Sequence, residues 1–256
     1  RRQRQMCIRD RKFIVNALHG EFGVSLKMQK NRPVIDIIKE MLPTSVKLGL
    51  IALLWATLVG VPLGALAAYH RGEKLDSFLR VLTTIGISAP GFVVATLLLL
   101  FFGVKLKIFP TMGLNTVGSY FMPCFSLGFY PMCYIARLSR SSMLDAIGQD
   151  YIRTARAKGV SEGKILFKHA LKNAFIPVLT YLGPLTAGII TGSMVVESVF
   201  SVQGLGRYFI NSVLNRDYPI IMATTLFFAF MVIVMNMVVD ILYSIIDPRI
   251  DLTKGD

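Results

Sequence analysis

A run of basic and small residues over positions 150–177 is the part of the sequence most suited to binding another macromolecule. Ala155 favours helix, and Gly159 suits the left-handed position just past a helix end. Ser161 is placed to cap a second helix, with Glu162 beside its positive N-terminus. The pattern predicts helix, turn, helix, with small residues that let another protein come close. A solvated basic loop is the alternative interpretation.

Other residue types with reactive side chains do not form a recognisable site. The sequence has no Gly-x-x-x-x-Gly-Lys-Ser/Thr phosphate loop, so we do not expect this chain to bind ATP. Cys7, Cys124 and Cys133 are too few and too badly spaced for a zinc site or a disulfide framework. We therefore expect no catalytic residue, no cofactor and no metal. The central parts of the apolar segments also lack the charged relays of ion-coupled carriers.

Long uncharged segments must position the basic loop. Hydrophobic residues make up 54% of the chain and charged residues only 17%. A helix of about 20 apolar residues crosses the hydrocarbon layer of a membrane. We expect an all-α polytopic bundle with five spans, the third of them short and interrupted by Pro123 and Pro131. The expected spans are residues 46–69, 81–104, 120–136, 173–196 and 218–243, within a transmembrane domain over 44–246.

The distribution of charge predicts the orientation. The net charge is +13, but many basic residues lie beside the ends of apolar spans, which argues against a nucleic-acid partner. Basic residues concentrate in the loop 140–172, which predicts that this loop is cytoplasmic. The tail, residues 247–256, then lies on the same side. The protein is expected in the inner, or cytoplasmic, membrane of a prokaryote.

The N-terminal region fits this layout less well, because it is strongly basic and would lie outside. We expect residues 1–12 to be a non-native or poorly ordered leader and 13–43 to be an extracytoplasmic segment. Pro33 can open a short amphipathic helix, which Pro43 would end, and Thr44 can cap the first span.

Polar and small residues in the spans suggest a path and a gate. Neutral hydroxyl groups could offer hydrogen bonds to a polar solute that crosses the membrane, although a structural role is an equal alternative for each. These path residues are Ser88, Thr180, Tyr181, Thr186, Thr191 and Ser193. Glu197, Gly204 and Gly206 follow the fourth span, where they could form an outer gate or meet a binding protein. Two small-x-x-x-small pairs, Gly60 with Gly64 and Gly188 with Gly192, predict close helix packing.

Several motifs together resemble the permease subunits of ABC importers, in the form found in dipeptide and oligopeptide systems. The loop carries YIRTARAKG followed by HALKNA and a proline, and the resemblance covers nearly all of the chain from about Lys12. The other matching motifs are LHGEFG from Leu18, RPV from Arg32, VVESVF from Val195, GLG from Gly204, RDYP from Arg216 and DPRI from Asp247. The general permease motif begins Glu-Ala-Ala, whereas this chain has Arg153-Thr154-Ala155 and Lys172 in place of a later proline. The peptide subgroup commonly shows this departure.

The resemblance implies a type I importer fold and a function. In the family the loop forms a coupling helix that docks on an ATPase, so it implies that role for Tyr151, Arg153, Thr154, Ala155, Ala157, Gly159, Ser161 and Glu162. It also implies two ABC ATPase subunits, a homologous second permease that completes a heterodimeric pore, and an extracytoplasmic solute-binding protein. Full-length members have six spans, so we expect that sequence before Arg1 is missing.

The expected function is translocation of di- or oligopeptides, driven by ATP hydrolysis on another subunit. Nickel chelates, glutathione and some sugars are further cargoes of similar proteins, and the sequence does not choose among them. The alternatives are an ion-coupled secondary transporter or channel, and a membrane-embedded enzyme.

Overall fold

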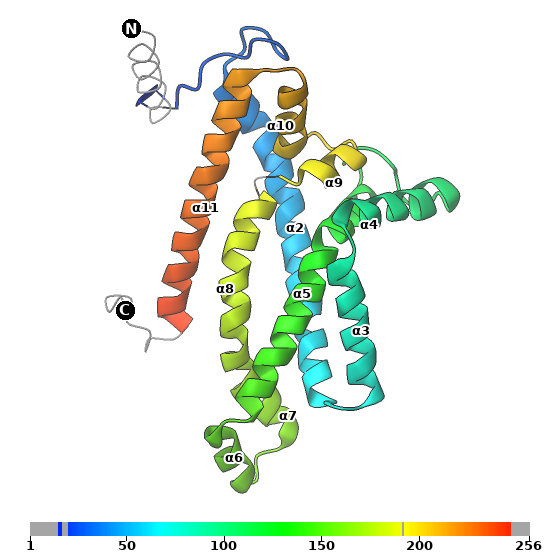
Figure 1. Cartoon of the computed structure of the whole chain (residues 1–256), viewed down its shortest axis with the longest axis vertical. Coiled ribbons are helices and arrows are strands. Elements are labelled where there is room, and N and C mark those ends of the chain that lie inside the picture. Colours follow the sequence, from blue (N-terminus) through cyan, green and yellow to red (C-terminus); the bar gives the residue numbers. More distant parts are fainter. Residues whose placement is uncertain (1–14, 17–19, 191, 247–256) are drawn as a thin grey trace.

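The chain is a bundle of helices (Figure 1). The computed structural model describes residues 15–16, 20–190 and 192–246. The expected leader, the tail, Leu18, His19 and Thr191 lie outside the described residues. Within those ranges the only strand-like pairing is an isolated bridge between Val24 and Pro33, in the loop that precedes the first long helix. The all-α fold expected from the sequence is therefore confirmed.

Helix α2, Val34–Tyr69, contains both the expected amphipathic helix and the first span in one unbroken element of 36 residues. The prediction that Pro43 ends a separate helix is wrong. A proline inside a helix removes one backbone hydrogen bond, but packing can outweigh that loss. Ile37 and Ile38, before the proline, are buried against α10 and α11, whereas Leu48, after it, is buried against α5. Continuous packing on both sides therefore keeps the helix intact.

The second expected span is bent. Helix α3, Lys74–Ser88, is followed by α4, Gly91–Leu98, and a π-helical turn over Leu99–Lys105, and the two parts meet at 98°. Ala89 between them is extended, with ψ 120°, because the ring of Pro90 disfavours a helical residue before it. The prediction of one continuous span over 81–104 is wrong, and α4 projects from the side of the bundle (Figure 1).

The third span is the centre of the bundle. A short 3-10 turn, Val117–Tyr120, leads into α5, Phe121–Ile147. Pro131 lies inside this helix without ending it, so the predicted interruption is wrong. Helix α5 packs against α2, α3 and α8. It also runs well past Ala136, into the region that the sequence assigned to the loop.

Close contact between α2 and α5 depends on glycine. A Cβ at Gly60 would lie 2.7 Å from the carbonyl oxygen of Met132, and one at Gly64 would collide with the carbonyl of Ala136. This pair confirms the predicted packing motif. A Cβ on Gly188 would meet no atom within 4 Å, so the second motif does not pack in the same way.

The rest of the chain returns through two long helices. Between them helix α8 ends at Ile190 and Gly192 takes a positive φ of 105°, so α8 itself does not continue to residue 196, where the fourth span was expected to end. The fifth expected span lies within α11. The remaining elements are α6 (Asp150–Ala157), α7 (Glu162–Lys164), a π-helical turn (Ile165–Ala170), α8 (Leu171–Ile190), α9 (Met194–Val199), α10 (Leu205–Leu214) and α11 (Tyr218–Ile246).

Three segments of the described chain are long and apolar enough to cross a membrane, and the bent pair would make a fourth. They are Val34–Tyr69, Glu162–Val199 and Tyr218–Val238. Helix α5 does not reach this criterion, so the predicted number of five is not confirmed. Its many buried positions face other helices and not lipid, so it need not be as apolar as α11. We call the two ends of the bundle the α6 end and the α10 end (Figure 1).

Candidate functional site

The predicted helix, turn, helix forms the tip of the α6 end. Helix α6 ends at Ala157, and Gly159 has a left-handed φ of 74°. A Cβ at Gly159 would meet no atom within 4 Å, so the outer surface of the turn is open. Ser161 occupies the position before α7, but its side chain makes no cap hydrogen bond. The predicted side-chain cap is therefore wrong, although the predicted turn is confirmed.

A bidentate ion pair closes the turn instead. Arg156 Nε lies 2.7 Å from Glu162 Oε1, and Nη2 lies 3.1 Å from Oε2. Sequence reasoning missed Arg156, although a base and an acid on either side of Gly159 could have suggested the pair. Arg153 makes only a looser contact of 3.5 Å with Asp150, and both side chains are exposed.

The loop is anchored firmly in the bundle. Ile152 of α6 and Ile165 after α7 are completely buried. They pack in one cluster with residues of α2, α5 and α8, including Ala65 and Met143. Of the eight residues expected to couple to an ATPase, all but the half-buried Ala155 are exposed. The tip therefore presents a small-residue surface on a buried apolar base.

Tyr151 adds a polar link to this base. Its hydroxyl oxygen accepts a hydrogen bond of 2.9 Å from the side-chain amide of Asn173 in α8. A displacement of α6 must therefore move α8, or break both this bond and the buried cluster.

A second assembly lies toward the α10 end, around the carboxylate of Glu197 in α9. Glu197 is completely buried. Oε1 accepts a hydrogen bond of 2.7 Å from the hydroxyl of Ser45 in α2, and Oε2 accepts one of 2.9 Å from the backbone N–H of Arg207. The Ser45 oxygen in turn accepts the N–H of Leu205 at 2.8 Å. The carboxylate thus ties α2, α9 and α10 together.

Glycines form the wall of this carboxylate site. A Cβ at Gly204 would lie 2.5 Å from the Glu197 carboxyl carbon, and one at Gly206 would lie 2.8 Å from the backbone nitrogen of Met194. The structure therefore brings together the three residues expected at an outer gate, and adds Ser45 and Gly192. Their role as a gate stays a prediction.

Asp217, between α10 and α11, forms a similar site nearer the tip of that end. Its carboxylate accepts the Ser25 hydroxyl at 2.6 Å. It also accepts three backbone N–H groups, of Leu26 at 3.2 Å and of Lys27 and Met28 at 3.0 Å. These bonds lower the pKa of Asp217 below its usual value, although burial alone would raise it.

The residues expected to line a path are mostly bonded to their own helices. The hydroxyls of Ser88, Thr180 and Thr186 each donate to the carbonyl four residues earlier. Ser193 instead caps α9 by accepting the N–H of Val196 at 3.3 Å. Thr191 lies outside the described residues. Ser88 and Thr180 are exposed. The centroid of the Tyr181 ring lies 4.3 Å from the centroid of the Tyr134 ring.

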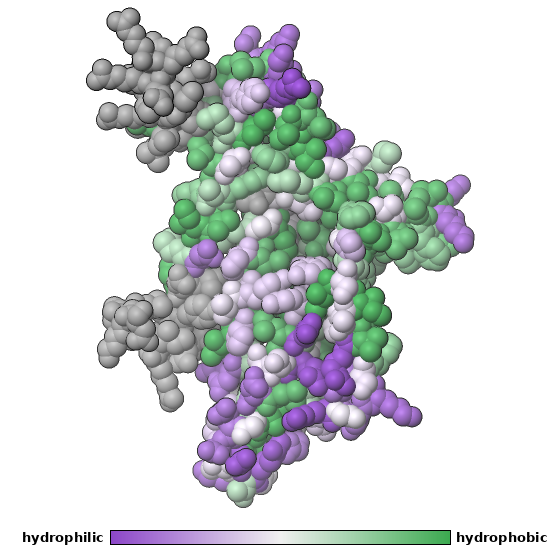
Figure 2. All heavy atoms as spheres, viewed as in Figure 1, coloured by the Kyte–Doolittle hydropathy of each residue, from purple (hydrophilic) through white to green (hydrophobic). Residues whose placement is uncertain are grey.

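Sequence reasoning missed a polar stripe on α5. Its exposed or half-buried residues at helical spacing are Tyr130, Tyr134, Arg137 and Ser141. Arg137 and Ser141 share a pocket with Arg80 and Thr84 of α3, and Tyr134 meets Tyr181 of α8. The polar seam is the name we give to the polar residues on three neighbouring helices. They are Tyr130, Tyr134, Arg137 and Ser141 of α5, Arg80, Thr84 and Ser88 of α3, and Thr180 and Tyr181 of α8. Residues of low or intermediate hydropathy occupy the middle of the face in Figure 2. A 3.6-residue period of polar groups in 130–141 was the signal available in the sequence.

Comparisons with known proteins agree with this architecture. The family described as "Binding-protein-dependent transport system inner membrane component" matches residues 60–252. The dipeptide permease DppB of Bacillus subtilis (strain 168) is 45% identical over 242 residues, which are 94% of this chain and 78% of that protein. The oligopeptide permease OppB of Haemophilus influenzae is 42% identical over 240 residues, 93% and 78% of the two chains. The glutathione permease GsiC of Escherichia coli (strain K12) is 41% identical over 238 residues, 93% and 77%.

Solved structures share the fold at low sequence identity. A chain of the methionine ABC transporter MetNI, in an inward-facing conformation, has a TM-score of 0.71 and 16% identity, with 82% of this chain and 96% of that chain covered. An amino acid ABC transporter with histidines gives 0.64 and 17%, with 81% and 92% covered. The type I importer fold expected from the resemblance is confirmed, and a secondary carrier or an enzyme is not favoured. The extent of the family match and the identity to these relatives show that this multi-pass membrane chain belongs to the family of binding-protein-dependent transport system inner membrane components.

Proposed function

We propose that this chain is a permease subunit of an ATP-driven importer that moves di- or oligopeptides across the inner membrane of a bacterium. The names of the similar permeases support a peptide cargo, since dipeptide and oligopeptide systems are among them. A separate ATPase supplies the energy. The assembled complex, and not this chain alone, would hydrolyse ATP.

The observation that supports ATPase docking best is the construction of the α6 end. The turn at Gly159 exposes small residues, so a cleft on another protein can close around it. Ile152 and Ile165, directly beside the turn, are completely buried among α2, α5 and α8. A push on the turn therefore reaches three long helices without an intervening flexible segment. A motor drives a change only if it binds the two states differently, and a rigid contact transmits the resulting displacement to the helices.

We assign the other expected partners to the polar seam and to the α10 end. A second, homologous permease would face the polar seam, because hydroxyl and guanidinium groups are costly against lipid. Two ATPase subunits would then dock, one on each coupling loop. A solute-binding protein would deliver the peptide at the α10 end, where Glu197 and its glycine walls hold α2, α9 and α10 together.

Gly159→Arg tests the docking role. The long side chain would occupy the open surface of the turn, so we expect insertion into the membrane to persist while co-purification with the ATPase and ATP-dependent peptide uptake are lost. Gly72→Arg is a matched control, because Gly72 also has a positive φ, of 85°, and also faces open space at the same end. Uptake at the wild-type rate in Gly159→Arg, or equal losses in both variants, would contradict the role.

A further inference from the structure

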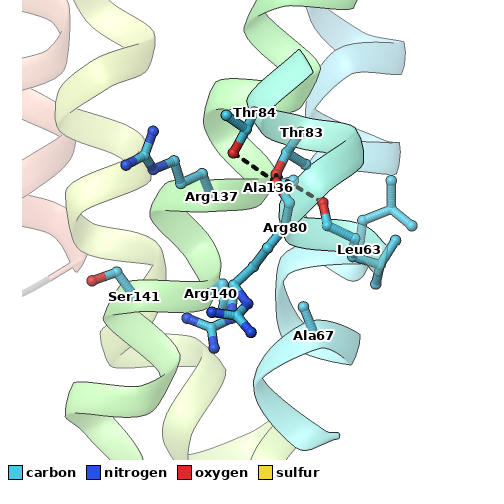
Figure 3. A pocket seen from close by; sticks show the side chains of 10 residues that line it. Leu63, Ala67, Arg80, Thr83, Thr84, Ala136, Arg137, Arg140 and Ser141 are labelled. Carbon is cyan, nitrogen blue, oxygen red and sulfur yellow. Dashed lines mark hydrogen bonds between the residues drawn. The ribbon is translucent and has the colours of Figure 1, made fainter. Parts of the chain in front are cut away.

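An open pocket of about 260 Å³ lies between α2, α3 and α5, in the half of the bundle nearer the α6 end (Figure 3). Three arginines line it, Arg80 from α3 and Arg137 and Arg140 from α5. Thr84 and Ser141 add hydroxyl groups at its rim. In Figure 3 the side chains of Arg137 and Ser141 project to one side of α5, away from Arg80 and Thr84 of α3.

The pocket carries an excess of positive charge. Asp76 accepts two hydrogen bonds from Arg140, Nε to Oδ1 at 2.6 Å and Nη2 to Oδ2 at 2.8 Å. Arg80 lies 3.6 Å from the same carboxylate. One acidic group therefore serves two guanidinium groups. No carboxylate among the described residues pairs with Arg137, whose side chain is exposed at the pocket. The pocket therefore offers a ligand one arginine without an ion pair in the described chain, Arg137, and one that is only weakly paired, Arg80.

The surroundings of the pocket indicate a solute and not a lipid. The face of α3 that would meet lipid carries Phe78, Val81 and Ile85, all strongly exposed. Arg80 and Thr84 lie on another side of α3, which turns toward the polar stripe of α5. The pocket thus opens onto the surface that a second permease would cover.

We propose that this pocket receives the C-terminal carboxylate of a peptide as the peptide leaves the seam toward the α6 end. The proposal rests on the proposed function, because it assumes that peptides pass along the polar seam. Arginine binds a carboxylate through two parallel hydrogen bonds, and every unmodified linear peptide carries this group at one end. Because Arg137 remains exposed to water, the interaction would be weak enough to release the cargo.

Thiol labelling measures the local field at the pocket. In an assembled complex with Cys7, Cys124 and Cys133 replaced, Ser141→Cys is exposed to two methanethiosulfonates of similar size, one carrying a sulfonate and the other a trimethylammonium group. The quantity to compare is the labelling rate with the anionic reagent divided by the rate with the cationic reagent. We expect this anion-to-cation ratio to be higher at Ser141→Cys than at a distant exposed site, Glu73→Cys. Adding Arg137→Gln should lower the anion-to-cation ratio by about fivefold, from the loss of one charge one helical turn away on α5.

Two matched variants separate charge from folding. Arg137→Lys keeps the charge and should keep the ratio, whereas Arg71→Gln removes an arginine of the same membrane face outside the pocket and should not change it. A ratio unaffected by Arg137→Gln, or lowered equally by Arg71→Gln, would overturn the proposal.

Protection by peptides tests the ligand itself. Millimolar trialanine should slow the labelling of Ser141→Cys, and trialanine amide, which lacks the carboxylate, should slow it much less. Equal protection by both peptides, or none by either, overturns the pocket as a carboxylate site. The proposed function fails separately, if the wild-type complex takes up no peptide with ATP present.

Discussion

Two carboxylates that join separate elements at each end of the bundle are held in contrasting ways. At the α10 end, Glu197 and Asp217 are bound by hydroxyl and backbone N–H groups, with no cation among the bonds described. At the α6 end, Asp76 and Glu162 are bound by arginines, Arg140 and Arg156. The donors at the first end belong to the backbone or to a short side chain. Those at the second end are at the tips of long side chains, apart from the backbone N–H of Gly72, which donates to Asp76 at 3.1 Å.

This difference in hydrogen-bond donors indicates which contacts can adjust when the molecule changes conformation. Backbone donors have fixed positions, so a carboxylate they hold locks the segments that carry them. An arginine can follow a displaced carboxylate by several ångströms, because its side chain has many rotatable bonds. We infer that α2, α9 and α10 move as one body, whereas at the α6 end the arginine–carboxylate pairs adjust while the buried cluster around Ile152 transmits the push. Substitutions at the two ends should therefore differ in their effect on stability.

Glu197→Ala should give the largest loss of stability. It leaves the Ser45 hydroxyl and the Arg207 N–H buried without their acceptor and also opens a cavity, at a cost of about 3 kcal/mol or more. Thermal unfolding of the purified complex measures this loss. Gly204→Ala should destabilise the same site by steric contact alone, because its Cβ would lie 2.5 Å from the carboxyl group. If both variants kept near-normal stability, the inference that α2, α9 and α10 are rigidly joined would be contradicted.

Asp76→Asn should have an intermediate effect, of about 2 kcal/mol, because it weakens charge-assisted hydrogen bonds from Arg140. Arg140 remains partly exposed, so water can satisfy its freed donors. Unfolding of the same complex measures the loss. Asp145→Asn is the control, because Asp145 is an exposed acid on α5 that forms no ion pair with the described residues. A loss larger than that of Glu197→Ala would reverse the ranking of the two ends.

Asp217 should make the α10 end sensitive to acid. Its pKa is lower in the folded chain than in the unfolded chain, so its stabilising contribution is present above about pH 4 and is lost as pH falls through the lower, folded pKa. Proteolysis of the loop that contains Ser25 should accelerate over that range. In Asp217→Asn the cleavage should be faster at neutral pH and should depend less on acid. A wild-type cleavage rate that is constant down to pH 3 would contradict the assignment.

Arg156→Gln should change stability least, because the pair with Glu162 is exposed to water. Added salt should reduce the difference between this variant and wild type further. Chemical denaturation at low and high salt provides the measurement. We still expect slower peptide uptake, because a less fixed turn docks less well. A large change in stability would mean that the tip is part of the folded core.

Much of the fold could be predicted from the sequence, because its signals are local. Long uncharged segments identify the helical body, and Gly159 between two helical patterns identifies the turn. The bend at Pro90 was also visible, as a proline after Ser88 and Ala89 in the middle of an apolar run. The apolar length of the whole run outweighed that signal in our prediction.

The contacts that decide the remaining features are distant in sequence. Pro43 does not end α2, because packing against α5, α10 and α11 holds both sides of the proline. Ser45 and Glu197 are 152 residues apart, so neither residue's type indicates the other as its partner. The pocket of arginines is likewise formed by α3 and α5, which are separated by the bent segment and a long connection.

Photo-crosslinking from the turn tests the central claim most directly. A benzophenone amino acid at Ala157, which is exposed beside Gly159, would be activated in intact membranes, with the same group at Leu54, on the apolar surface of α2, as the control. The account predicts that position 157 crosslinks to an ATPase subunit and that position 54 does not. Crosslinks from position 157 only to lipid, or only to a protein on the outer side of the membrane, would contradict it.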